Sequence, residues 1–99
     1  MTDKANWDLV SFVMASEIRF RIMVSLNERV QTPTELMKKF VVPISRISAV
    51  LKELNEKKLI ENLTPERRKV KMYSLTNLGK NVLQEIHKLT EVGGGKVGK

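Results

Sequence analysis

Apolar residues recur every three or four positions in several stretches of the chain, which is the spacing of one face of an α-helix. The clearest stretch begins near Ser45, where Ile47, Val50, Leu51 and Leu54 stand at i, i+3, i+4 and i+7. This spacing predicts an amphipathic helix of about three turns with one buried face. Similar patterns predict four further helices, over residues 7–14, 17–27, 33–40 and 77–90.

Local capping signals indicate where these helices begin and end. Ser16 and Thr76 precede apolar periodic segments and are suitable N-caps. Thr32 is followed by a proline at the first helical position and by Glu35 three residues later, which favours a capping box. Pro43 disfavours helical geometry in the residue before it, so we expect the third helix to stop near residue 41 and a tight turn to follow.

Two short strands are predicted between the fourth and the last helix, over residues 59–63 and 70–75. Residues 69–72 alternate polar with apolar, as in a half-buried strand. Pro65 cannot donate a ladder hydrogen bond, so the intervening segment is predicted as a hairpin loop, with cations at its tip. The predicted fold is therefore mainly α with a small β-hairpin (α+β), in the order helix, helix, helix, helix, strand, strand, helix.

Composition limits the size and chemistry of this fold. The 99 residues are 41% hydrophobic and 29% charged, which predicts one globular domain, over residues 1–91, with residues 92–99 as a flexible Gly/Lys tail. The absence of cysteine excludes disulfides, thiolate metal sites and cysteine nucleophiles. No signal peptide or membrane span is apparent, so we expect a soluble, cytoplasmic protein. The 18 Lys and Arg exceed the 11 Asp and Glu, and the net charge of +7 favours an anionic partner.

The order of these motifs resembles that of a known family. Residues 32–36, 47–54, 58–61 and 73–79, with residues 16–23 before them, resemble the winged helix-turn-helix transcriptional regulators of the ArsR and MarR type. The chain departs from that pattern at two glycine positions, which hold Val41 or Val42 in the turn and Lys58 before the first wing strand. The cysteine-bearing metal box of many ArsR proteins is also missing, so a thiolate metal sensor is not expected.

The resemblance implies that residues 45–57 form a recognition helix in the major groove of DNA. Arg46 then contacts a guanine edge, Ser45 and Ser48 contact bases or phosphates, Ala49 approaches a thymine methyl and Lys52 reaches a phosphate. In the alternative interpretation these cations are solvated surface, with Lys52 paired to Glu56. The predicted wing and supporting-helix contacts to DNA are Arg67, Arg68, Lys69, Lys71, Thr34, Lys38 and Lys39.

Terminal helices of this family dimerise, so the resemblance also implies a homodimer that reads a palindromic site. The predicted dimer contacts are Trp7, Phe12, Val82, Ile86 and Leu89. The predicted function is a double-stranded DNA-binding transcriptional regulator, without enzymatic activity, cofactor or metal. Two alternatives remain open, a protein-docking module and an RNA-binding winged helix. The lone His87 is interpreted as a packing or surface residue.

Overall fold

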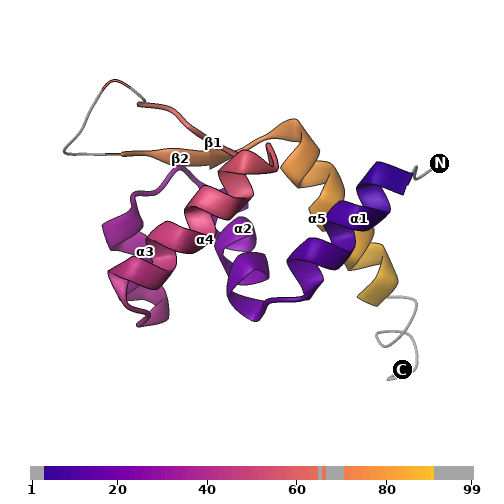
Figure 1. The fold of residues 1–99 in the computed structure, drawn as a ribbon, viewed down its shortest axis with the longest axis horizontal. Helices are drawn as coiled ribbons and strands as arrows, with labels where there is room; N and C mark the ends of the chain where they lie inside the picture. The colour runs from indigo at the N-terminus through magenta and orange to yellow at the C-terminus, as the bar shows by residue number, and fades with distance from the viewer. Residues whose placement is uncertain (1–3, 65, 67–70, 91–99) are drawn as a thin grey trace.

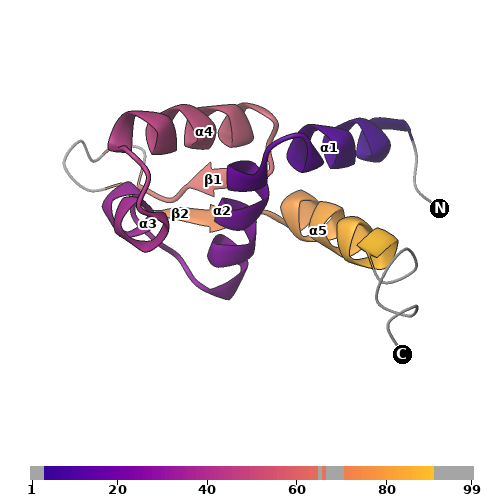
Figure 2. The same cartoon turned by 90° about the horizontal axis from the view of Figure 1, so that it is seen from below.

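A computed structural model describes residues 4–64, 66 and 71–90. Within these ranges the chain forms five helices and one antiparallel hairpin, in the predicted order (Figure 1). The helices are α1 (Lys4–Met14), α2 (Glu17–Glu28), α3 (Pro33–Phe40), α4 (Ile44–Glu56) and α5 (Asn77–Thr90), and the strands are β1 (Ile60–Asn62) and β2 (Tyr73–Leu75). Helices α1 and α5 pack together at one end of the molecule, and α3 lies at the other end (Figures 1 and 2).

One hydrophobic core joins all the helices to the hairpin. The predicted apolar stripe of α4 is confirmed, because Ile47, Val50, Leu51 and Leu54 are all buried. They share one core with buried side chains of the other elements, among them Val13, Ile22, Leu36, Ile60 and Val82. The helical periodicity of the sequence thus identifies the face of α4 that packs against the core, and the opposite face is therefore exposed to solvent.

The predicted helix caps are confirmed. Ser16 Oγ accepts a hydrogen bond from the Arg19 amide at 3.4 Å, and Thr76 Oγ1 accepts one from the Gly79 amide at 3.0 Å. In the capping box of α3, Thr32 Oγ1 accepts from the Glu35 amide at 3.2 Å, and Glu35 Oε1 accepts from the Thr32 amide at 2.9 Å. Each cap satisfies amides that a helix start otherwise leaves without partners.

The hairpin strands are shorter than predicted. Ile60 pairs with Leu75 and Asn62 with Tyr73, and beyond them the Leu63 amide donates to the Met72 carbonyl at 2.7 Å. Lys71 and Met72 are exposed and lie outside the strand, so the prediction of a half-buried strand at these two positions is wrong. The hairpin extends past the core at these positions, so the alternation of polar and apolar residues does not correspond to a buried face. Residues 67–70 and 92–99 lie outside the described residues.

The backbone takes a left-handed conformation at the two positions where the family pattern led us to expect glycine. Val41 ends α3 with φ 54° and ψ 52°, and Lys58, two residues after the end of α4, has φ 66°. A side chain in this region meets the following carbonyl oxygen, which costs about 1–2 kcal/mol per residue. Both turns therefore adopt the left-handed conformation although valine and lysine disfavour it.

Gly79 brings α5 against the base of the hairpin. A Cβ atom at this position would lie 2.2 Å from the Leu59 carbonyl oxygen, which is too close for any side chain. The Thr76 hydroxyl donates to that same carbonyl at 3.0 Å, so the start of α5 is tied to the residue before β1. Among the described residues, no helix is long and apolar enough to span a membrane.

Candidate nucleic-acid interface

Helix α3, a three-residue turn and helix α4 form a compact helix-turn-helix unit. The turn comprises residues 41–43. Pro43 occupies the N-cap position of α4 without a side-chain hydrogen bond, and α4 begins at Ile44, one residue before the predicted start. The Val42 amide donates to the Met37 carbonyl at 3.3 Å, which closes the end of α3 and directs the chain into the turn. With Leu36 on α3 and Ile47 on α4 both completely buried, the angle between the two helices is set by core packing.

The face of α4 opposite the core is exposed, polar and small near its start. Arg46 lies at the edge of a shallow hollow, beside Glu17 of α2 and Phe40 and Val42 of the α3 end. Among the described residues no ion pair joins Lys52 to Glu56, so the alternative pairing predicted for Lys52 is not formed. All five predicted α4 contacts to DNA lie exposed on this helix: Ser45, Arg46, Ser48, Ala49 and Lys52.

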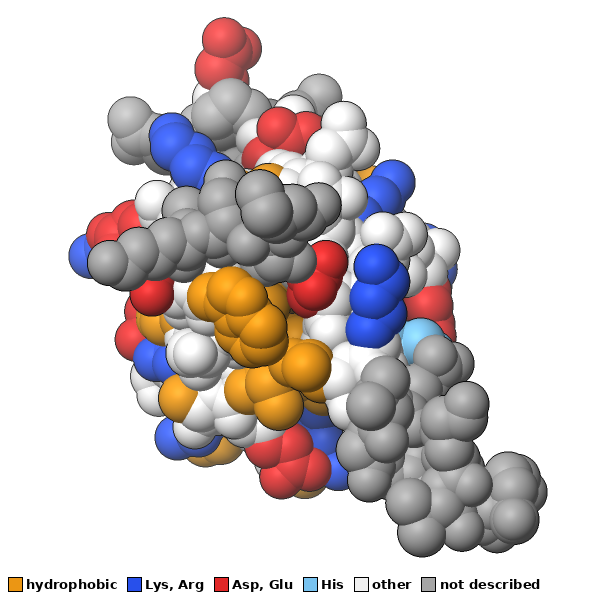
Figure 3. Space-filling model, turned by 90° about the vertical axis from the view of Figure 1, so that its right-hand side faces the viewer, with side chains coloured by type: hydrophobic (Ala, Val, Ile, Leu, Met, Phe, Trp, Pro, Cys, Tyr) orange, Lys and Arg blue, Asp and Glu red, His pale blue; other side chains and the backbone are white. Residues whose placement is uncertain are grey.

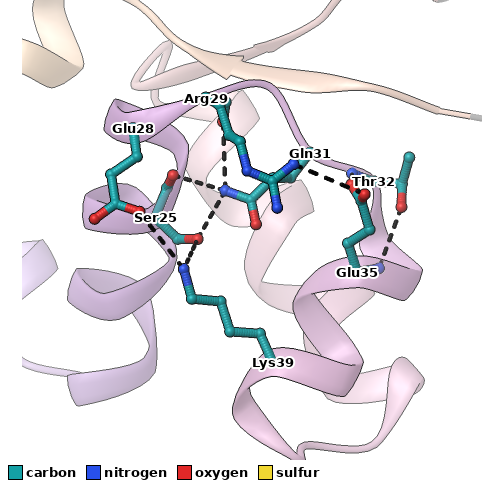
Figure 4. Close-up of polar contacts among 7 residues, drawn as sticks. All are labelled: Ser25, Glu28, Arg29, Gln31, Thr32, Glu35 and Lys39. Atoms are coloured by element: carbon teal, nitrogen blue, oxygen red, sulfur yellow. Dashed lines mark hydrogen bonds and ion pairs between the residues drawn. The ribbon is translucent and has the colours of Figure 1, made fainter.

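Two neighbouring lysines of α3 have different surroundings. Lys38 is exposed, as is Thr34 one turn before it. Lys39 instead turns toward α2, where its Nζ donates a 2.9 Å hydrogen bond to Ser25 Oγ and lies 3.7 Å from Glu28 Oε1 (Figure 4). Among the described residues Lys38 therefore has no ion-pair partner, whereas Lys39 contacts Ser25 and Glu28 of α2.

The loop between α2 and α3 depends on Gln31, which the sequence analysis did not single out. Its side chain is 1% exposed, and its Nε2 donates to the Ser25 carbonyl at 2.6 Å and to the Ser25 hydroxyl at 2.7 Å (Figure 4). Its backbone exchanges hydrogen bonds with Tyr73 of β2, at 3.2 and 2.9 Å. One residue thus joins α2, the entry to α3 and the hairpin. Its only signal in the sequence is a polar residue just before a helix cap, which is not specific.

Only the base of the predicted wing lies within the described residues. Lys71 is exposed, and the Met72 amide after it donates to Thr64 Oγ1 across the hairpin at 3.1 Å. Tyr73 is partly buried against the core, and this burial raises the pKa of its phenol above its ordinary value of 10.0. Arg67, Arg68 and Lys69, the other predicted wing contacts, lie outside the described residues.

The end of the molecule formed by α1 and α5 carries exposed apolar surface. Figure 3 views this end and shows hydrophobic side chains gathered near its centre, with charged side chains around them. Trp7 is 46% exposed and Leu89 39% exposed, while Phe12 is half-buried. Val82 and Ile86 are buried inside the same chain, so the apolar surface here is supplied by the ends of the helices, not by the middle of α5.

A helix-turn-helix unit followed by a β-hairpin and a further helix defines a winged helix-turn-helix domain. Residues 7–92 match the family model described as the N-terminal domain of the methanogenesis regulatory protein FilR1. The chain belongs to this family of winged-helix regulators, as the resemblance to ArsR and MarR regulators predicted. No curated protein sequence matches the chain.

Solved structures share the fold at low sequence identity. HlyU from Vibrio cholerae is 22% identical with a TM-score of 0.71, over 92% of this chain and 97% of that one. The transcriptional regulator BldR from Sulfolobus solfataricus is 22% identical with a TM-score of 0.72, over 91% and 67%. A mutant of MarR from E. coli, complexed with operator DNA, is 23% identical with a TM-score of 0.70, over 89% and 64%. The chain thus spans less than two thirds of the MarR chain.

Proposed function

We propose that this domain binds double-stranded DNA in a sequence-specific manner and acts as the DNA-binding domain of a transcriptional regulator, with α4 as the recognition helix. The observation that carries the proposal is the division of α4 into two faces. Its apolar stripe, Ile47, Val50, Leu51 and Leu54, is buried, and its outer face presents a guanidinium, hydroxyls and one small residue that no other element of the described chain covers. A helix with such a face fits the width of the major groove of B-DNA.

The side chains on that face match distinct features of a duplex. The Arg46 guanidinium suits the two acceptors of a guanine edge, a bidentate contact worth about 1–3 kcal/mol of base discrimination. Ala49 permits close approach, and the Ser45 and Ser48 hydroxyls can donate to or accept from base edges or phosphates. Lys52 on α4 and Lys38 and Thr34 on α3 are assigned to phosphates, and Lys71 to the basic wing together with Arg67, Arg68 and Lys69.

A net charge of +7 and the regulatory family support an anionic nucleic-acid partner. The MarR relative of the same fold was solved with operator DNA. In the family match the domain is the N-terminal part of a regulator, which agrees with a DNA-binding module over residues 1–91. Catalysis is not part of the proposal, since the family and the neighbouring folds are regulators.

We further propose that two copies associate through the α1–α5 end. Exposed Trp7 and Leu89 supply an apolar contact there, whereas the predicted dimer contact Phe12 is half-buried within the chain. A two-fold axis at this end would present two recognition helices to successive major grooves, about 34–36 Å apart, and would select palindromic sites. Sedimentation of the wild type and of Trp7→Ala tests the contact, with Met14→Ala, which removes another exposed apolar side chain of α1, as the control.

Duplex binding over a salt series tests the DNA proposal. The purified chain is titrated with a random duplex and with duplexes selected from a random pool, and Arg46→Ala is compared with Lys88→Ala, which removes the same charge from the far end of α5. We expect the selected duplex to bind at least about 1000-fold more tightly than the random one. Arg46→Ala should reduce this ratio by about 5- to 150-fold, the equivalent of 1–3 kcal/mol. Lys88→Ala should leave the ratio unchanged.

The double variant Arg67→Ala/Arg68→Ala tests the wing, with Lys80→Ala/Lys88→Ala as its charge-matched control. The wing variant should weaken both duplexes alike and flatten the salt dependence, because phosphate contacts carry no sequence information. A wild type with no preference between the duplexes, and no effect of Arg46→Ala, would overturn the proposal. Preference for an RNA over any duplex would assign the domain to RNA, and absence of nucleic-acid binding would favour protein docking.

A further inference from the structure

Arg19, in the first turn of α2, holds three helices together. Its Nη1 donates a 2.7 Å hydrogen bond to the Phe12 carbonyl on α1, and its Nε donates a 3.1 Å hydrogen bond to Glu53 Oε1 on α4. The guanidinium carbon lies 3.9 Å from the centroid of the Phe12 ring. The Arg19 side chain is only 20% exposed, so these contacts are screened by the protein from much of the solvent.

The contact set requires an arginine. A planar guanidinium can stack on a ring while its edge donates to two acceptors in fixed directions, whereas a lysine ammonium is a single point donor. Lys57, directly after α4, adds a second cation 5.2 Å from the Phe12 ring centroid. Phe12 is therefore contacted from both α2 and the end of α4, and its ring and carbonyl link α1 to the helix proposed to read DNA.

We propose that Arg19 is a positioning residue that fixes α4 relative to α1. Helix α1 lies at the end proposed to contact a second copy. Through Arg19, the position of α1 determines the angle at which the outer face of α4 is presented to DNA. The inference rests on the proposed function for its effect on DNA, but the link between the helices is a property of the free chain. Arg19 has no assigned contact to DNA and acts through Glu53 and Phe12.

The first test measures the α1–α4 link without DNA. The chain has no cysteine, so Ser11→Cys on α1 and Ser48→Cys on α4, both exposed, provide two spin-label sites. We expect one narrow distance distribution in this background and a broader or shifted one after Arg19→Met, which keeps an apolar stem and removes the guanidinium. Arg21→Met is the matched control, because Arg21 lies on the same helix and, among the described residues, its one ion pair is with the exposed Glu17. Equal distributions in Arg19→Met and Arg21→Met would overturn the proposal.

The second test measures the consequence for DNA, with unlabelled variants at a temperature where thermal unfolding shows each to be folded. Arg19→Met and Glu53→Ala should lower the ratio of selected to random duplex affinity by about 3- to 30-fold, the range expected of couplings through packed networks. Their controls, Arg21→Met and Glu56→Ala, should keep the wild-type ratio, since each makes the same charge change outside the contact set.

The outcomes separate the two proposals. A purely structural Arg19 would lower the melting temperature and leave both the distance distribution and the affinity ratio of the folded protein unchanged, which would overturn the inference. A broadened distribution with an unchanged ratio would also overturn it, because α4 would then bind without being positioned. If the wild type prefers no duplex, the proposed function fails, and the spin-label comparison alone decides whether Arg19 fixes α4.

Discussion

The side-chain amide of Gln31 donates a 2.7 Å hydrogen bond to the Ser25 hydroxyl, and both residues are almost completely buried. The same amide also donates to the Ser25 carbonyl, so one side chain closes the loop between α2 and α3. Lys39 adds a donor to the Ser25 hydroxyl from α3. The start of the helix-turn-helix unit is thus held in place by a polar contact set inside the protein (Figure 4).

We expect Gln31→Ala to lower the free energy of unfolding by about 1–3 kcal/mol, because buried acceptors of Ser25 lose their donor. Gln84→Ala, which truncates an exposed glutamine of α5, should change it by less than about 0.5 kcal/mol. Urea denaturation followed by circular dichroism measures both values. Equal stabilities of the two variants would show that the Gln31 amide makes no net contribution to the free energy of unfolding.

The adjacent residues Lys38 and Lys39 should affect different properties. Lys38→Ala should weaken binding to every duplex and reduce the slope of log affinity against log salt by about 0.9 for each bound copy of the chain, the value for one phosphate contact. Lys39→Ala should leave that slope unchanged and lower the free energy of unfolding by up to about 1 kcal/mol, because its ammonium contacts Ser25 and the exposed Glu28.

These two measurements, salt-dependent binding and urea unfolding, are made on both variants. A salt slope that falls equally in Lys38→Ala and Lys39→Ala would contradict the assignment, since it would mean that the Lys39 ammonium leaves Ser25 when DNA is present.

Local patterns were sufficient to predict most of the fold. The apolar spacing of Ile47, Val50 and Leu51 and the hydroxyls of Thr32 and Thr76 act within one or two helical turns, so their consequences are visible in a short window of sequence. The outward face of α4 follows from the same periodicity, because residues that are not on the buried stripe must lie outside it. This is why the candidate site residues of α4 are all exposed.

Contacts between distant segments were not predictable in the same way. Arg19 and Glu53 are 34 residues apart, and nothing near either residue indicates the other. Which of Lys38 and Lys39 contacts α2 depends on where Glu28 of α2 lies, which periodicity within α3 does not specify. Burial of Val82 and Ile86 likewise results from the packing of α5 on α1. Such features depend on tertiary packing, which a single sequence does not display.

Glycine should stabilise the two left-handed positions. Val41→Gly and Lys58→Gly remove the steric cost of a side chain at φ 54° and φ 66°, which is about 1–2 kcal/mol. Part of this gain is offset, because glycine also raises the entropy of the unfolded chain. We expect each variant to raise the free energy of unfolding by about 0.5–1 kcal/mol in thermal or urea denaturation. Val24→Gly, within α2, is the control and should lower it by about 1 kcal/mol. Destabilisation by Val41→Gly would show that its exposed side chain makes a contact that outweighs the strain.

Tyr73 should make the fold less stable in alkali. Burial raises the pKa of its phenol above 10.0, so in alkali the unfolded chain releases this proton at a lower pH than the folded chain. Well below pH 10 both states keep the proton and the group has no effect on the pH dependence; as pH rises through 10, the unfolded state binds fewer protons and stability falls. Because lysines titrate in the same range, the measurement is the difference in unfolding free energy between the wild type and Tyr73→Phe from pH 9 to pH 11.

The wild type should lose stability relative to Tyr73→Phe as pH rises through this interval, and phenolate absorbance of the chain's single tyrosine should rise at higher pH in the folded than in the unfolded protein. A folded-state midpoint at or below 10.0 would contradict the expectation that burial raises the pKa of this phenol.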